Sequence, residues 1–212
     1  MNKNRGIKLV NLIKEHIKNN AKEYLIVTLI FIIGIFAGVF FLNNMQEAPK
    51  TDVTNYLNNF INKLKENQDL DLVGLLKNSI MQNLILGVVI WFFGTTVIGI
   101  PIVFGIVLYR GFCLGYTIST SILVLGLTKG LTFSIVTLLI QNILFIPAIL
   151  ALAVSGFKLY KSIIKDKRKE NIKLEILRHT IFSLIMLILL IISAIIEIFI
   201  STNILSNIIK YF

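Results

Sequence analysis

The chain contains five long apolar runs that are almost free of charged residues. A helix needs roughly 20 apolar residues to cross the hydrocarbon core of a bilayer, and each run offers about that length. A water-soluble chain would instead alternate apolar and polar residues with the period of a strand or a helix. The runs comprise residues 24–42, 84–108, 111–127, 131–157 and 180–200. The bilayer is therefore the solvent in which this chain folds.

The runs predict membrane-spanning helices. Lipid offers no hydrogen-bond partners to the backbone, so only helices and closed barrels can span it, and continuous rather than alternating hydrophobicity excludes a barrel. The first run is followed by Asn43, Asn44 and Met45 rather than by a small-residue cleavage site, so we interpret it as a retained anchor. We expect an all-α, polytopic integral membrane bundle of about five transmembrane helices in one membrane domain.

The basic residues are concentrated in two segments beside the apolar runs. Residues 1–23 hold six of the 21 lysines and arginines, and residues 158–179 hold eight. The positive-inside rule places both segments in the cytoplasm, so four spans separate them and the C-terminus lies outside. This N-in/C-out topology makes residues 43–83 an extracytoplasmic loop, with Arg110 in a tight inner loop and Lys129 in an outer one. The net charge of +10 thus does not indicate nucleic-acid binding.

Two segments outside the runs have amphipathic helical patterns. Residues 7–22 carry lysines opposite an apolar face, a pattern that rests on anionic lipid of the inner leaflet, although we retain the simpler interpretation of an ordinary basic flank. In the 43–83 loop, apolar residues recur at helical spacing after Thr51 and Asp52, which can cap a helix. This stripe either rests on lipid or on the protein's own spans, or it docks an extracytoplasmic partner. The candidate docking residues are Val53, Leu57, Phe60, Ile61 and Leu64.

Polar side chains at membrane depth are costly, so each is a structural or functional candidate. Glu197 lies within the last run, where it either pairs with Lys129 or Arg110 or acts as a relay or ligand. The amides of Gln141 and Asn142 are expected to hydrogen-bond across helices. Glycines spaced four residues apart predict close packing of helix backbones. These pairs are Gly34 with Gly38, Gly111 with Gly115, and Gly126 with Gly130.

The residue patterns that membrane enzymes require are missing from the sequence. Its two histidines, His16 and His179, are both expected to flank spans on the cytoplasmic side, so neither can activate a serine at membrane depth. There is no His-Glu-x-x-His zinc motif and no phosphate-binding glycine-rich loop. We therefore expect a non-enzymatic protein without catalytic residues, metal or cofactor. A transporter or permease subunit that uses Glu197 and the glycine-rich second run is the alternative, and assembly into a homo-oligomer stays open.

Two short segments resemble a known protein family. Tyr109-Arg-Gly-Phe-Cys-Leu-Gly-Tyr-Thr117 opens the third run, and Ser193-Ala-Ile-Ile-Glu197 lies in the last. In these residues, and in the order and spacing of its spans, nearly the whole chain resembles the stage II sporulation protein M family.

The resemblance implies a scaffold in the cell membrane, on the mother-cell side of the sporulation septum. Such a scaffold recruits and localises two peptidoglycan-degrading partners, stage II sporulation proteins D and P, for septal wall thinning and engulfment of the forespore. Residues 51–64 are then the docking candidate. A scaffold is expected to tolerate Glu197→Gln if packing survives and to fail when Phe60 and Leu64 become polar, whereas a carrier is expected to show the reverse.

Overall fold

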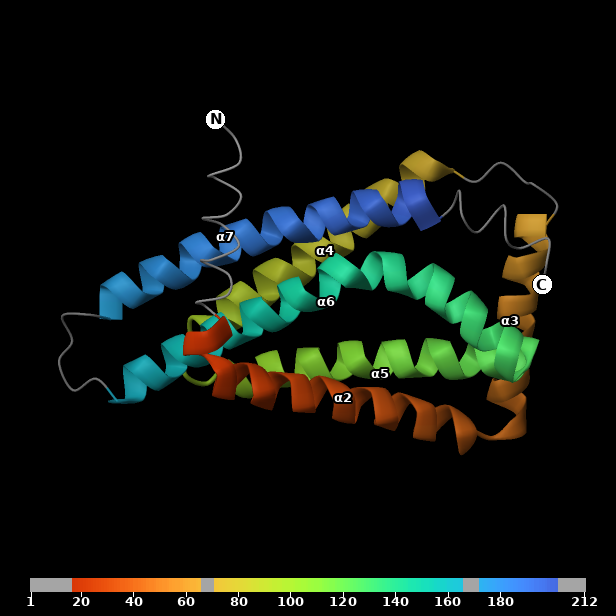
Figure 1. Cartoon of the computed structure of the whole chain (residues 1–212), viewed down its shortest axis with the longest axis horizontal. Coiled ribbons are helices and arrows are strands. Elements are labelled where there is room, and N and C mark those ends of the chain that lie inside the picture. Colours follow the sequence, from red (N-terminus) through yellow and green to blue (C-terminus); the bar gives the residue numbers. More distant parts are fainter. Residues whose placement is uncertain (1–16, 66–70, 166–171, 202–212) are drawn as a thin grey trace.

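The computed structural model describes residues 17–65, 71–165 and 172–201, and the regular structure within these ranges is helical. Figure 1 shows that most of the helices run back and forth along one long axis, while α3 lies across one end of the bundle. The elements are α2 (Ala21–Asn43), α3 (Glu47–Lys65), α4 (Leu72–Gly94), α5 (Ile100–Leu125), α6 (Leu127–Lys165), α7 (Ile172–Ile196) and a short π-helix, η1 (Glu197–Ser201).

Five helical segments of the described residues are long and apolar enough to cross a membrane, which confirms the predicted membrane bundle and its number of spans. The whole of α2, α4 and α5 qualifies, together with Asn142–Ile164 of α6 and Ile172–Phe199 of α7 and η1. The first span agrees with the predicted 24–42 to within a few residues. The chain is thus a polytopic helical membrane protein.

The second and third spans begin earlier than the sequence predicted. The predicted run 84–108 contains a turn at residues 95–99, so α4 ends at Gly94 and α5 begins at Ile100. Pro101 lies in the first turn of α5, where its missing N–H costs no helical hydrogen bond. Hydropathy alone did not reveal this break, because Val97 and Ile98 in the turn are themselves apolar.

The predicted 43–83 loop is correspondingly shorter and mostly helical. The Asp71 side chain accepts a hydrogen bond of 2.9 Å from the Gly74 N–H and so caps the start of α4. Arg110, expected in a tight inner loop, lies instead in the middle of α5.

Helix α6 is longer than the predicted span 131–157, and it continues into the region expected to be a basic loop. It has 39 residues and contains Pro147. Proline removes one helical hydrogen bond and its ring crowds the preceding turn, and Figure 1 shows that α6 bends along its length. Because α7 begins at Ile172 rather than at the predicted residue 180, residues 158–165 and 172–179 are both helical.

The described parts of the two basic segments lie at the same end of the bundle. The start of α2, the 95–99 turn, the end of α6 and the start of α7 gather there (Figure 1). Lys161 of α6 forms a 2.8 Å ion pair with Glu23 in the first turn of α2. An even number of spans therefore separates the two segments, as the charge pattern required. That this end faces the cytoplasm stays a prediction of the positive-inside rule, and residues 7–16 lie outside the described residues.

Helices α2 and α5 pack backbone against backbone. Four of the predicted packing glycines lie in this contact, and at each of them an added Cβ would collide with a carbonyl oxygen of the opposite helix. Only glycine allows so close an approach. The colliding pairs are Gly34 with Leu108, Gly38 with Phe112, Gly111 with Phe31, and Gly115 with Ile35.

The third predicted glycine pair serves a different purpose. Gly126 forms the turn between α5 and α6 with a φ of 80°, a backbone conformation that residues other than glycine rarely adopt. A Cβ added at this position would have no neighbour within 4 Å, so Gly126 does not bring two helices together. Its predicted packing role is therefore wrong. Gly130, one turn into α6, does lie against the backbone of Ser121 and Ile122 in α5.

Candidate functional site

The predicted docking stripe on α3 is divided between the interior and the surface. Ile61 is only 4% exposed, Val53 and Leu57 are half-buried, and Phe60 is 40% exposed. Helix α3 packs on α5, so the buried part of the stripe rests on the protein's own bundle. The side chain of Leu64 lies outside the described residues.

The exposed side of α3 carries an aromatic residue that the sequence analysis missed. Tyr56 is 78% exposed and precedes Phe60 by four residues, so both rings lie on one face of the helix. Its signal was present in the sequence, but the predicted stripe of Val53, Leu57, Phe60, Ile61 and Leu64 did not include it. The exposed aromatic residues of this candidate surface are therefore Tyr56 and Phe60.

A second candidate site is a polar centre inside the bundle. Glu197 opens the π-helix η1, and its carboxylate oxygen Oε2 accepts a 2.7 Å hydrogen bond from the hydroxyl of Ser79 in α4. Single π-helical turns within α-helices frequently occur at functional sites. Glu197 was predicted from the sequence as a polar residue at membrane depth, whereas Ser79 was expected in the outer loop.

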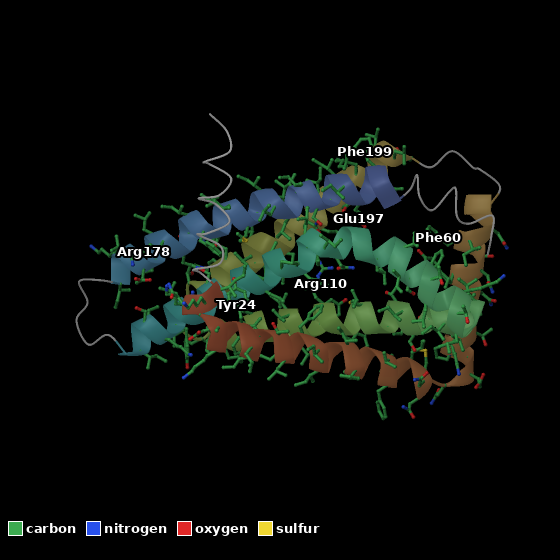
Figure 2. The ribbon with its side chains drawn as sticks, in the orientation of Figure 1. Tyr24, Phe60, Arg110, Arg178, Glu197 and Phe199 are labelled. Carbon is green, nitrogen blue, oxygen red and sulfur yellow. The ribbon has the colours of Figure 1, made fainter. Side chains whose placement is uncertain are left out.

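Of the two cations predicted to pair with Glu197, the structure brings Arg110 into electrostatic range of it. Figure 2 shows Arg110 projecting from α5 toward α6, with Glu197 on the α7 side of α6. The guanidinium carbon of Arg110 lies 5.1 Å from the centre of the Phe145 ring, and its buried Nε has no hydrogen-bond partner among the described residues. Lys129 is exposed in the first turn of α6.

The amide of Asn142 was predicted to bond across helices, but it bonds within its own helix. Its Nδ2 donates to the carbonyl oxygen of Leu138, one turn earlier in the same helix, at 2.7 Å. The side chain of Gln141 lies outside the described residues. Among the described residues, the amide of Asn83 does cross between helices, although the sequence predicted this residue at the end of a loop. Its Nδ2 donates to the Leu190 carbonyl of α7 at 3.0 Å, and the residue is 4% exposed.

Asn83→Leu is expected to lower the free energy of unfolding by about 1 kcal/mol, because it removes an interhelical hydrogen bond while keeping the side-chain volume. Asn142→Leu is the matched control, since it removes an amide that bonds only within its own helix. Thermal unfolding in detergent measures both. Equal losses in the two variants would mean that the α4–α7 hydrogen bond contributes nothing specific.

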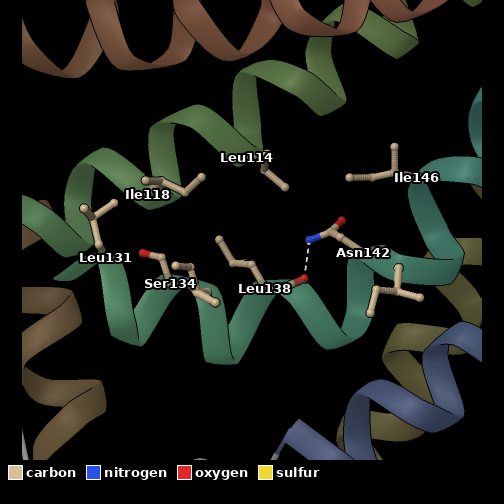
Figure 3. Close-up of a pocket in the computed structure, with 9 residues that line it drawn as sticks. Leu114, Ile118, Leu131, Ser134, Leu138, Asn142 and Ile146 are labelled. Atoms are coloured by element: carbon tan, nitrogen blue, oxygen red, sulfur yellow. Dashed lines mark hydrogen bonds between the residues drawn. The ribbon is translucent and has the colours of Figure 1, made fainter. Parts of the chain in front are cut away.

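Asn142 also borders an apolar groove between α5 and α6, of about 330 Å³. Figure 3 shows its walls: Leu114 and Ile118 from α5 face Leu131, Leu138 and Ile146 from α6. Ser134 contributes a buried hydroxyl that has no hydrogen-bond partner among the described residues. The lining suits an acyl chain or apolar side chains better than a hydrated ion.

The contact between a histidine and a serine was not predicted, because His179 was expected to lie in a basic loop beside a span. His179 is 3% exposed within the last span, and its Nδ1 lies 2.9 Å from the Ser155 hydroxyl of α6. Its Nε2 lies 3.4 Å from the Trp91 carbonyl of α4. Since a carbonyl only accepts, Nε2 carries the hydrogen and Nδ1 accepts from Ser155. His179 thus joins three helices by hydrogen bonds, and the early start of α7 is what places it inside a span.

Comparison with known proteins identifies the chain. The family model of stage II sporulation protein M matches residues 27–202, which confirms the resemblance seen in residues 109–117 and 193–197. No curated protein and no solved structure is similar enough to the chain to match it. The matched range extends from the first span through η1, and so contains both α3 and the polar centre. The chain therefore belongs to the stage II sporulation protein M family, and it is a sporulation-related membrane protein.

Proposed function

We propose that this protein is a non-enzymatic membrane scaffold that recruits peptidoglycan-degrading partners to the sporulation septum. The observation that carries the proposal is the position of α3, which lies across the end of the bundle opposite the basic residues (Figure 1). Positive-inside topology makes that end extracytoplasmic, where the cell wall and its hydrolases lie. The septal membrane on the mother-cell side is the proposed location.

The packing of α3 supports a docking role. The buried Ile61 and half-buried Leu57 fix one side of the helix on the bundle, while Tyr56 and Phe60 stay exposed on another. Exposed aromatic residues on a helix that is already held in place are the usual anchors of protein interfaces, because little conformational entropy is lost when they are buried. The peptidoglycan chemistry would then belong to the partners, for which stage II sporulation proteins D and P are the candidates.

The proposal is tested by affinity capture of the tagged protein from detergent-solubilised sporulating cells. The variant Tyr56→Asp/Phe60→Asp is expected to lose at least about tenfold of the captured stage II sporulation proteins D and P, because removal of a central aromatic anchor costs about 2 kcal/mol or more. The matched control is Asn55→Asp/Asn59→Asp, which adds the same two charges to exposed positions of α3. The control is expected to capture as much as the wild type.

If the aromatic variant and its control reduce partner capture equally, docking through Tyr56 and Phe60 is refuted. A correctly inserted wild type that captures neither hydrolase would refute the scaffold itself. The transporter alternative is separated by Glu197→Gln, which keeps an acceptor for the Ser79 hydroxyl. If the protein is a scaffold, the variant still captures its partners and the cells still sporulate. If it is a carrier that depends on the Glu197 carboxylate, the cells fail to sporulate although partner capture is unchanged.

A further inference from the structure

A second pocket, of about 200 Å³, lies between the end of α6 and the start of α7. Figure 2 labels Arg178 at this end of the molecule. The pocket belongs to neither the polar centre around Glu197 nor the α3 surface. Its lining combines basic, hydroxyl and apolar side chains: Ser155, Lys158, Leu159, Glu175, Arg178, His179 and Phe182.

The charged groups of the pocket favour an anion. Lys158 is exposed and forms no ion pair with a described residue. One nitrogen of Arg178 donates to Glu175 at 2.8 Å, but a guanidinium has five N–H donors, and the Arg178 side chain is 64% exposed. Two cations against one carboxylate leave a net positive charge, with donors free to bind phosphate oxygens.

The floor of the pocket is uncharged, buried and hydrogen-bonded. His179 donates to the Trp91 carbonyl and accepts from Ser155. His179 is 3% exposed and Ser155 is 8% exposed. Gly94 and Gly156 lie against each other beside this group and bring α4 close to α6. Because the floor carries no charge, Lys158 and Arg178 determine that the ligand is negatively charged.

The remaining walls and the location indicate the source of the phosphate. Leu159 and Phe182 give the pocket an apolar side, and both belong to helices that continue into membrane spans. Basic pockets between transmembrane helices at the cytoplasmic side bind the headgroups of anionic lipids. We propose that this pocket binds the phosphate of an anionic phospholipid headgroup, with Lys158 and Arg178 as its ligands.

The test measures binding of dioleoyl-phosphatidylglycerol to the full chain in detergent by native mass spectrometry, with dioleoyl-phosphatidylcholine as the zwitterionic reference. Lys158→Gln/Arg178→Gln is expected to weaken phosphatidylglycerol binding at least about tenfold, since it removes both of the charged hydrogen-bond donors that would bind the phosphate. Lys22→Gln/Lys173→Gln is the matched control, because it removes two exposed charges at the same end of the bundle without touching the pocket. Its binding is expected to change less than twofold.

Glu175→Gln is expected to strengthen phosphatidylglycerol binding rather than weaken it. It frees Arg178 and removes the one negative charge of the pocket, so phosphatidylglycerol should bind about two- to fivefold tighter. Equal loss of binding in the pocket variant and its control would overturn the proposal, because it would show only a diffuse surface charge. Competition by inorganic phosphate at the affinity of the lipid would overturn the lipid assignment in favour of a free anion. All substituted side chains reach the surface or line the pocket mouth, and retained α-helical circular dichroism shows that the variants fold.

Discussion

Gly38→Val is expected to lower the free energy of unfolding by about 3 kcal/mol, the upper range for overpacking a close contact. The added Cβ would collide with the Phe112 carbonyl and would lie 2.8 Å from the Tyr116 backbone nitrogen. These are backbone atoms in the middle of α5, so they cannot rotate away as a side chain could. The only relief is separation of α2 from α5 along their whole contact, which sacrifices the dispersion energy that holds membrane helices together.

The control for this prediction lies in the same pair of helices. Gly105 of α5 has nothing within 4 Å of the position that a Cβ would occupy. Gly105→Val therefore makes the same chemical change without a collision, and it is expected to leave stability unchanged or slightly raised, because valine has a higher helix propensity than glycine. Thermal unfolding in detergent, followed by the loss of the monodisperse peak in size-exclusion chromatography, compares the two. If Gly38→Val unfolds at the temperature of Gly105→Val, the close α2–α5 contact does not exist in the protein.

Glu197→Leu is the second substitution expected to have a large effect, with a loss of about 2 kcal/mol in the free energy of unfolding. It leaves the Ser79 hydroxyl without its acceptor, and it removes the negative charge that lies within electrostatic range of Arg110. A charge in a low-dielectric interior is tolerated because of such a counter-charge.

The reason given for this loss is tested by a double-mutant cycle. Arg110→Met removes the isolated cation, so the double variant Arg110→Met/Glu197→Leu is expected to recover at least about 1 kcal/mol of the loss caused by Glu197→Leu. Glu197→Gln, which retains an acceptor for Ser79, is expected to lose less than Glu197→Leu. Strict additivity of Arg110→Met and Glu197→Leu would show that the two residues stabilise the bundle independently.

The number of spans could be predicted from the sequence because hydrophobic length is a property of each segment alone. The boundaries of the second and third spans could not be predicted from hydropathy, because Val97 and Ile98 make the turn at 95–99 part of a continuous apolar run. Gly94, Gly99 and Pro101 were recognisable as possible helix breakers, but they did not say which of them ends a helix. That single misplaced turn moved Arg110 out of a supposed loop and into the interior of α5. It also moved Ser79 and Asn83 from a supposed outer loop into α4, where both bond to the last span.

The candidate sites show the same limit. Glu197 was recognisable because a carboxylate in an apolar run is rare, whereas its partner Ser79 is an ordinary residue that only the tertiary arrangement makes notable. The α3 stripe was recognisable from its spacing, but spacing cannot say which part of a stripe is covered. The structure covers Ile61 and leaves Tyr56 exposed because α5 passes beneath only one side of α3.

The α2–α5 contact also sets an order for biosynthesis. The glycine face of α2 leaves the ribosome and enters the bilayer before its partner exists, since α3 and α4 must be made before Gly111 and Gly115 of α5 appear. During that interval α2 can be held in the membrane by its hydrophobicity alone, as a single inserted helix that has not yet packed. The first tightly interlocked pair of the nascent chain is therefore not made of neighbouring helices, and it closes only after roughly half of the protein has been synthesised.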